Sequence, residues 1–197
     1  MKTKSMIACA LFAAIISIFA VRTIPIGIVP ITMGLFGIML TGIVLGYKNG
    51  IISVVIYLLI GIVGLPVFSN FRTGIQTLAG PTGGYLWSYI IMVWIIGVLT
   101  VKLPKNKWLA WLKIFAACLM GIVVSYAAGT IQFMLVQRVD LIKALTLCVI
   151  PFIPFDILKA IIATYVGSLI SKTLRRANLL PESHKKQQEV NNKEESK

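Results

Sequence analysis

The sequence is poor in acidic residues and in charge altogether. Six of its 197 residues are Asp or Glu, and 13% of all residues are charged, against roughly 25% in soluble domains. Four of those acidic residues fall after position 181, so Asp140 and Asp156 stand alone before it. A chain that is 58% hydrophobic cannot cover its surface with polar groups, which excludes a soluble protein and predicts a multi-pass membrane protein.

Residues for metal binding and catalysis are also scarce. Cys9, Cys118 and Cys148 lie far apart in apolar runs, and His184 is the sole histidine, so neither a metal site nor a disulfide framework is expected. The motifs GxxxxGK[ST], HExxH and GxSxG are absent from the sequence. We therefore expect no ATP hydrolysis by this chain, no cofactor and no enzymatic activity.

Basic residues produce a net charge of +13, but they do not indicate a nucleic-acid partner. They lie in short segments between apolar runs rather than in a stripe with interleaved aromatic residues. With a cytoplasmic N-terminus, four cations fall outside, at Arg22, Arg72, Arg138 and Lys143. The positive-inside rule then predicts that both termini are cytoplasmic, because the inner side carries Lys2, Lys4, Lys48, Lys102, Lys105, Lys107, Lys113, Lys172, Arg175, Arg176, Lys185, Lys186, Lys193 and Lys197.

Hydrophobic runs predict an all-α protein with six transmembrane helices. No small-x-small cleavage site follows the first run, which we therefore interpret as a retained helix rather than a signal peptide. Breaks are expected at Thr23–Gly27 and at Tyr47–Gly50. The predicted helices are Met6–Val21, Ile28–Gly46, Gly50–Val63, Tyr85–Val101, Trp108–Val136 and Leu147–Ser171.

The segment Gly64–Gly84, between the third and fourth predicted helices, has an unusual composition. It contains two prolines and five glycines, yet also Leu65, Phe68 and Phe71. Irregular backbone near a membrane is tolerated where it is buried in protein or lines a cavity, so we expect a re-entrant or lid-like loop on the outer side. Residues 1–177 are expected to form one transmembrane substrate-binding domain, and the polar residues 178–197 a disordered cytoplasmic tail.

Asp156 and Lys159 are the leading site residues. They lie about ten residues into the sixth run and, three positions apart, share one helix face. Ionisable groups at membrane depth usually face the bundle interior and serve function. Two interpretations remain open: a polar anchor for a small ligand, or a neutralising pair that holds helices together. Pro151 and Pro154 are expected to open the helix start beside them.

Weaker candidates lie in the outer loop and on the helices. Arg72 is either an interfacial residue or a clamp for a ligand carboxylate. Thr82 is expected to be the N-cap of the fourth helix. Ala10 and Ala14 form a small-xxx-small pair, either for internal packing or for docking a partner subunit. Further candidates for polar contacts are Asn70, Gln76, Tyr85 and Thr32, with Gln132 weaker.

Five sequence motifs occur together along the chain. GLPVF is followed by GPTGGY at a characteristic separation, and PFIPFDILKA comes later. The motifs are Ile24–Thr32, Tyr57–Phe71, Gly80–Tyr89, Ala128–Phe133 and Pro151–Ala160. Together they resemble the BioY family, the biotin-specific S components of energy-coupling factor (ECF) transporters. The similarity covers roughly residues 5 to 175.

The resemblance implies a six-helix S-component fold that binds biotin near the outer face of the bacterial cytoplasmic membrane. It implies that Asp156 and Lys159 line the biotin site and that the loop between the third and fourth helices closes over it. Ala10 and Ala14 would then dock on a transmembrane coupling protein, which works with two ATPase subunits and drives uptake by toppling the S component.

Two positions depart from the family pattern. Met33 and Gly34 stand where a leucine and a glutamine are common, which removes a polar group, and Phe155 replaces a glycine and is expected to narrow the pocket. Two alternatives therefore stay open. The chain is either an S component for another vitamin, such as thiamin or riboflavin, or a non-transport membrane protein with a structural Asp–Lys pair.

Overall fold

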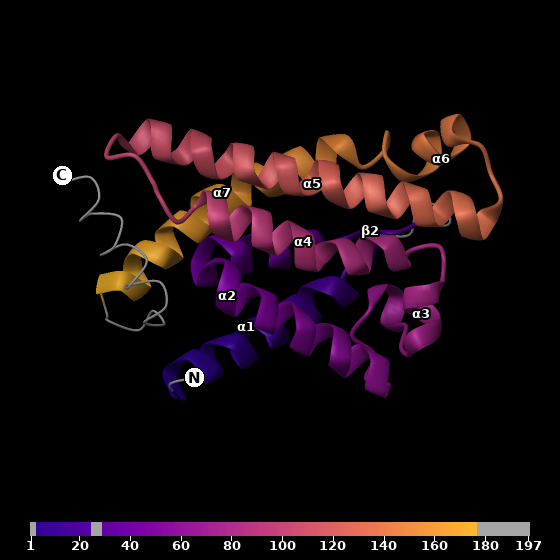
Figure 1. The fold of residues 1–197 in the computed structure, drawn as a ribbon, viewed down its shortest axis with the longest axis horizontal. Coiled ribbons are helices and arrows are strands. Elements are labelled where there is room, and N and C mark those ends of the chain that lie inside the picture. The colour runs from indigo at the N-terminus through magenta and orange to yellow at the C-terminus, as the bar shows by residue number, and fades with distance from the viewer. Residues whose placement is uncertain (1–2, 25–28, 177–197) are drawn as a thin grey trace.

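The structure is a computed structural model that describes residues 3–24 and 29–176, and it is an elongated bundle of helices (Figure 1). Residues 178–197, the predicted tail, lie outside the described residues. The elements are α1 (Thr3–Val21), β1 (Thr23–Ile24), β2 (Ile31–Thr32), α2 (Gly34–Val63), η1 (Ser69–Phe71), α3 (Ile75–Ala79), α4 (Gly83–Leu99), α5 (Lys107–Gln137), α6 (Leu141–Cys148) and α7 (Ile153–Arg176).

Four helices of the described part, α1, α2, α5 and α7, are long and apolar enough to cross a membrane, and α4 is a shorter apolar helix. This composition agrees with a multi-pass membrane protein. Large apolar side chains remain exposed on these helices, among them Leu135 at 75% and Leu169 at 57%. Such exposure is costly in water and favourable in lipid.

Helix α2 consists of two arms joined at Gly46. The backbone there has φ 71° and ψ −175°, a conformation that essentially only glycine adopts. A Cβ atom on Gly50 would lie 3.7 Å from the carbonyl oxygen of Thr41, although nine residues of straight helix span about 13.5 Å. The chain therefore doubles back at Gly46, which separates the second and third predicted helices.

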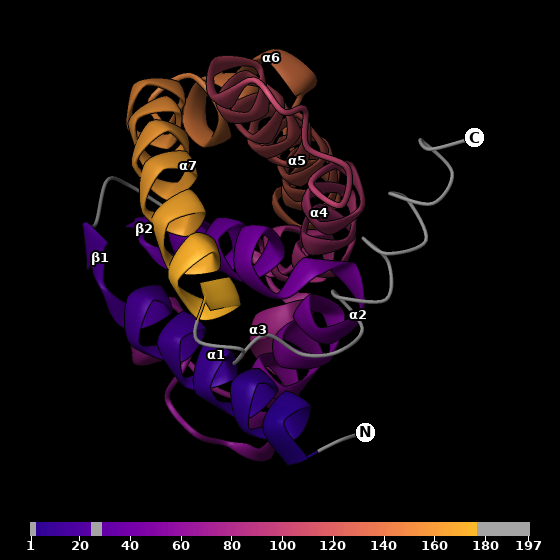
Figure 2. The ribbon, with the colours of Figure 1, turned by 90° about the vertical axis from the view of Figure 1, so that its left-hand side faces the viewer.

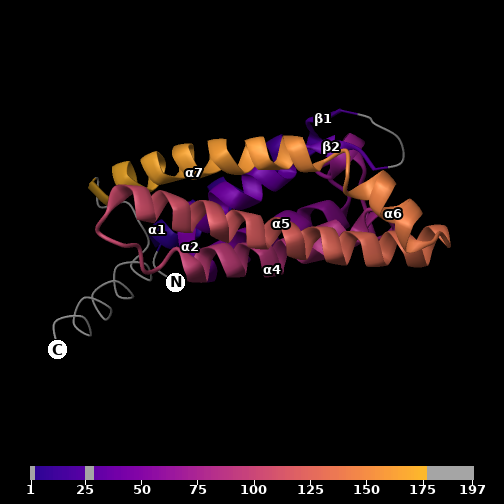
Figure 3. The ribbon, with the colours of Figure 1, turned by 90° about the horizontal axis from the view of Figure 1, so that it is seen from above.

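The two ends of the bundle differ (Figures 1 and 3). The start of α1, the end of α7 and the α4–α5 connection lie at one end, whereas β1, β2, α3 and α6 lie at the other. At the first end, the Ser5 hydroxyl donates to Asn49 Oδ1 at 2.9 Å and ties α1 to the second arm of α2. The second end holds the irregular segment 64–84, and we call it the loop end.

The segment 64–84 is anchored to the bundle by Phe68. Its side chain is fully buried, fills the space left by the missing side chain of Gly61, and meets the Tyr57 ring edge-on at 5.6 Å. Thr23 on β1 donates a hydrogen bond to Asn70 Oδ1 at 2.6 Å. The segment thus packs against α1 and α2 although α3 is its only α-helix.

Several predicted boundaries were wrong. The second helix begins at Gly34 rather than at residue 28, because Ile31–Thr32 pairs antiparallel with Thr23–Ile24. The expected turn at Tyr47–Gly50 is helical, and the break occurs at Gly46. The sixth run splits into α6 and α7 because the backbone leaves helical geometry at Val149. Asp156 consequently lies in the first turn of α7.

Candidate functional site

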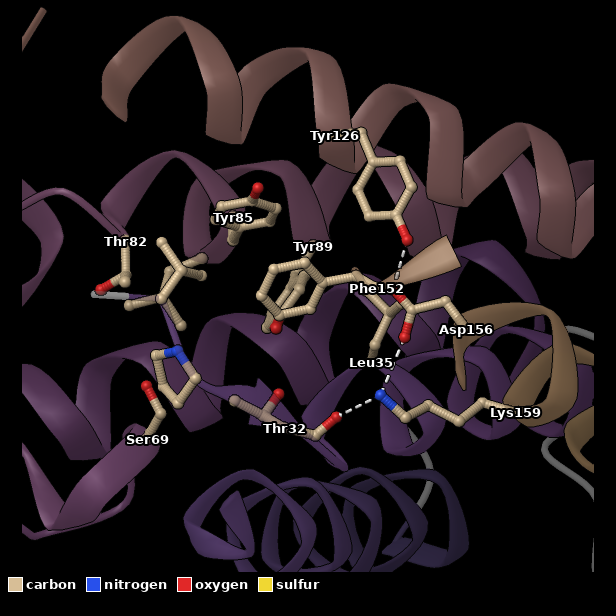
Figure 4. A pocket seen from close by; sticks show the side chains of 13 residues that line it. Thr32, Leu35, Ser69, Thr82, Tyr85, Tyr89, Tyr126, Phe152, Asp156 and Lys159 are labelled. Atoms are coloured by element: carbon tan, nitrogen blue, oxygen red, sulfur yellow. Dashed lines mark hydrogen bonds and ion pairs between the residues drawn. The ribbon is translucent and has the colours of Figure 1, made fainter. Parts of the chain in front are cut away.

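A hydrogen-bonded network of four residues lies inside the bundle at the loop end (Figure 4). Lys159 Nζ donates to Asp156 Oδ1 at 2.8 Å and to the carbonyl oxygen of Thr32 at 2.7 Å. Tyr126 donates its hydroxyl proton to Asp156 Oδ2 at 2.7 Å. Both charged residues are buried, with 4% of Asp156 and 7% of Lys159 exposed. Each carboxylate oxygen therefore has a partner, as buried charges require.

The network forms one wall of a small, open cavity of about 60 Å³. Ser69 and Thr82 lie at the side away from Asp156 and Lys159 in Figure 4. The cavity is thus polar at two ends and aromatic between them, and it is lined by Val29, Pro30, Thr32, Leu35, Ser69, Thr82, Tyr85, Leu86, Tyr89, Tyr126, Phe152, Asp156 and Lys159.

The connection from α6 to α7 places the charged pair at the cavity. Helix α7 begins at Ile153, and the Asp156 backbone N–H donates to the Phe152 carbonyl oxygen at 2.9 Å. A carboxylate in the first turn is favoured by the helix dipole. The spacing of three residues then brings Lys159 onto the same face, one turn deeper along α7.

Glycines at the start of α4 allow close packing against neighbouring backbone. A Cβ atom on Gly83 would overlap the Leu78 carbonyl, and one on Gly84 would overlap the Ala128 carbonyl of α5. Gln132 secures this corner because its Nε2 donates to the carbonyl oxygens of Leu78 at 2.7 Å and Gly80 at 2.8 Å. Gln132 thus holds the α3–α4 connection, which carries Thr82 into the cavity wall.

Tyr85 is positioned by α5 and α6 together. Its ring packs over Gly129, where any side chain would overlap it, and its hydroxyl donates to the Cys148 carbonyl oxygen at 2.8 Å. The ring therefore stands as a fixed wall between the two polar ends of the cavity.

Five of the predicted site residues line this cavity: Thr32, Thr82, Tyr85, Asp156 and Lys159. Thr82 occupies the N-cap position of α4, but its side chain makes no capping hydrogen bond. The other three predicted ligand contacts lie elsewhere in this conformation. Asn70 bonds Thr23, and Arg72 and Gln76 are exposed outside the cavity lining.

The sequence interpretation missed Tyr126, Tyr89, Ser69 and Phe152, all of which line the cavity. Tyr126 carried a usable signal, because a tyrosine hydroxyl in an apolar helix needs a hydrogen-bond partner. Nothing in the sequence indicates that this partner is Asp156, thirty positions later.

The two departures from the family pattern have simple structural explanations. Gly34 opens α2, and its N–H donates to the Thr32 hydroxyl oxygen at 3.3 Å. The expectation that Phe155 narrows the pocket was wrong. Phe155 is 45% exposed and absent from the cavity lining, because its neighbour Asp156 takes the inward face of α7.

Known proteins resemble this chain in sequence and in architecture. A sequence model of the BioY family matches residues 1–176. The chain belongs to the BioY family. A biotin transporter BioY from Thermotoga maritima is 37% identical over 169 residues, covering 86% of this chain and 96% of that protein.

Further relatives of this BioY chain agree with that assignment. A biotin transporter BioY2 from Lactococcus lactis subsp. cremoris is 33% identical, with 90% of this chain and 95% of that protein covered. The crystal structure of an S component for biotin from an ECF-type ABC transporter superimposes with a TM-score of 0.80. It is 31% identical to this chain, and the match covers 87% of this chain and 92% of that one.

Proposed function

We propose that this protein captures biotin at the outer face of the cytoplasmic membrane and delivers it as the S component of an ECF-type ABC transporter. The observation that carries the proposal is the buried Tyr126–Asp156–Lys159–Thr32 network on the wall of a cavity in a chain of the BioY family. A binding subunit needs such a buried polar anchor for its ligand, and the ATP would be hydrolysed by two separate ATPase subunits.

Biotin suits the two polar ends of the cavity. Its ureido ring carries two N–H donors and one carbonyl acceptor, which match the Asp156 carboxylate and the Lys159 ammonium. The apolar thiophane ring would pack between Tyr85, Tyr89 and Phe152. The biotin carboxylate would then reach the Ser69 and Thr82 side, where the segment 64–84 closes as a lid and Arg72, Asn70 and Gln76 complete the site on closure.

Calorimetric titration of biotin into the detergent-purified chain tests this function, with thiamin and riboflavin titrated in parallel. Asp156→Asn and Lys159→Ala should each weaken biotin binding by about 30-fold or more, because each leaves a buried partner unpaired. The chain offers a matched control at the same spacing, Asp140→Asn and Lys143→Ala, on two exposed residues of the α6 region.

Each result of the titration is decisive. Unchanged biotin binding in the control pair, with loss in the site pair, supports the capture function. If the folded wild type binds thiamin or riboflavin instead, that vitamin and not biotin is the substrate. A wild type that binds none of the three, and loses only stability in Asp156→Asn, would make the pair structural.

We further propose six membrane crossings: α1, the two arms of α2, α4, α5 and α7. Both termini would be cytoplasmic and the loop end would face outward. Cysteines introduced at Lys105 and Gln76, both exposed and at opposite ends, test this arrangement with a membrane-impermeant maleimide on intact cells. Labelling at Gln76→Cys but not at Lys105→Cys is expected, and the reverse pattern would invert the topology.

A further inference from the structure

A second cavity lies at the end of the bundle opposite the biotin site. It lies between the end of α4, the first turns of α5 and the last turns of α7, and its volume is about 290 Å³. Figure 2 looks onto this end, with α7 on one side and α4 and α5 on the other. Its lining is Ile43, Thr100, Leu103, Lys107, Ala110, Trp111, Ile114, Ser168, Ser171 and Lys172.

The cavity is positively charged without a compensating acid. Lys107 enters from α5 and Lys172 from α7. Within residues 3–24 and 29–176 the acidic side chains are Asp140 and Asp156. Asp156 is paired with Lys159, and Asp140 precedes α6 at the loop end. Two lysines on separate helices thus face one space without an anionic partner in the described part of the chain.

Ser171 adds a hydrogen-bonding group to the cavity wall. It is 6% exposed and lines the cavity, yet its hydroxyl makes no hydrogen bond with any described residue. The neighbouring hydroxyls of Ser168 and Thr100 instead donate to carbonyls of their own helices, at 2.6 Å and 2.7 Å. The Ser171 hydroxyl is therefore open to the cavity and able to donate to an acceptor oxygen between the two lysines.

The remaining lining and the adjacent surface are apolar. Leu103, Trp111 and Ile114 line the cavity, and Trp111 stacks on Trp108 at 5.7 Å. Trp108 is 68% exposed and Leu109 50%. Tryptophan and lysine at a helix end are typical of the boundary between lipid headgroups and acyl chains. The ligand therefore combines an anionic group with a hydrocarbon part.

We propose that this cavity binds the headgroup of an anionic phospholipid. The phosphate lies between Lys107 and Lys172 and accepts a hydrogen bond from Ser171, and the acyl chains run along the exposed apolar face of α5. Basic pockets between transmembrane helices are a recognised way to hold such headgroups. The site is separate from the biotin cavity and does not depend on the biotin assignment.

Native mass spectrometry of the full-length protein in a neutral detergent tests this site, with dioctanoyl-phosphatidylglycerol as the probe and dioctanoyl-phosphatidylcholine as the zwitterionic comparison. The variant Lys107→Met/Lys172→Met should weaken phosphatidylglycerol binding about thirtyfold, given the usual contribution of each lysine near a charged lipid surface. Ser171→Ala should weaken it by a smaller factor. The matched control Lys105→Met/Lys143→Met removes the same charge from exposed residues outside the cavity.

Circular dichroism and thermal unfolding show whether each variant is folded. Biotin binding is not used as the criterion, so the lipid test stays independent of the proposed function. Retention of phosphatidylglycerol over phosphatidylcholine, lost in the cavity variant and kept in the control, supports the proposal. Equal losses of phosphatidylglycerol binding in both double variants would mean that total surface charge, and not the cavity, attracts the lipid. Displacement of the lipid by equimolar inorganic phosphate would make the site a phosphate site. Equal binding of phosphatidylglycerol and phosphatidylcholine would exclude recognition of an anionic headgroup. Each of these last three outcomes overturns the proposal.

Discussion

At the scale of single residues, the site depends on how two charges are kept inside a membrane protein. Asp156 and Lys159 neutralise each other at 2.8 Å, while Tyr126 and the Thr32 carbonyl add one hydrogen bond each. One Lys159 N–H and further lone pairs of the carboxylate stay available to a ligand. A buried pair of this kind gains little stability by itself, because desolvation offsets the attraction. Its value is that both groups are already desolvated and oriented when a ligand arrives.

Tyr126→Phe removes the hydroxyl that orients the Asp156 carboxylate. A hydrogen bond to a charged group is worth about 1.5–3 kcal/mol, so we expect biotin binding to weaken about tenfold or more, measured by calorimetry. Tyr165→Phe is the matched control, since Tyr165 is on α7 but 68% exposed. Equal affinities in the two variants would remove Tyr126 from the site.

The pairing of Asp156 with Lys159 was predictable from sequence, because spacing along one helix fixes it. The contacts between helices were not. Tyr126 meets Asp156, and Gln132 bonds the carbonyls of Leu78 and Gly80, over separations that no local pattern encodes. Gln132 was a weak candidate for ligand contact, and the structure gives it these backbone partners outside the cavity lining.

At the scale of elements, glycine and proline determine where helices end, and hydropathy alone does not. Predicted helices four and five lie within two residues of α4 and α5 at each end. The second and sixth helices were predicted to begin too early because Pro30 and Pro151 occur in apolar sequence that is not helical. Apolar residues there line the ligand cavity, as Val29 and Phe152 do, so hydropathy could not distinguish them from a membrane span.

Gly46→Ala should destabilise the hairpin between the two arms of α2. A side chain at φ 71° and ψ −175° costs about 1–3 kcal/mol, so the melting temperature in detergent should fall. Gly37→Ala, in regular helix where a Cβ atom would come no closer than 3.3 Å to Ile16, serves as the control. A melting temperature lower for Gly37→Ala than for Gly46→Ala would contradict the requirement for glycine at the turn between the two arms.

Phe68→Ala should loosen the segment 64–84 from the bundle. Truncating a fully buried phenylalanine costs about 3–5 kcal/mol, so biotin should dissociate faster and trypsin should cleave sooner after Arg72. Dissociation is measured by chase of radiolabelled biotin. Phe71→Ala is the control in the same segment, because Phe71 is 66% exposed; a similar dissociation rate in both variants would refute the lid.

At the scale of the whole molecule, the chain presents different surfaces to its partners. Ala10 and Ala14 are exposed on α1, where small side chains allow a second helix to approach closely. Gly42, by contrast, packs internally against Ile96. The exposed alanines agree with the proposed docking of a transmembrane coupling protein, at a face remote from the ligand cavity.

Ala10→Trp/Ala14→Trp should abolish co-purification with the coupling protein and leave biotin binding within about twofold, because neither residue lines the cavity. Affinity purification of the co-expressed complex measures the first effect and calorimetry the second. Ile161→Trp/Ile162→Trp, on the exposed face of α7, is the control. Retained co-purification of the alanine variant would place the interface elsewhere.

The mutual neutralisation of Asp156 and Lys159 has a consequence for the energetics of uptake. In the toppling movement that the family resemblance implies, the Asp156–Lys159 pair would add no net charge to the body that reorients. One elementary charge crossing the potential corresponds to about 2.3 kcal/mol per 100 mV. Lys159→Met would leave the Asp156 charge uncompensated, so uptake by this variant should respond differently from the wild type when the membrane potential is collapsed at constant ATP.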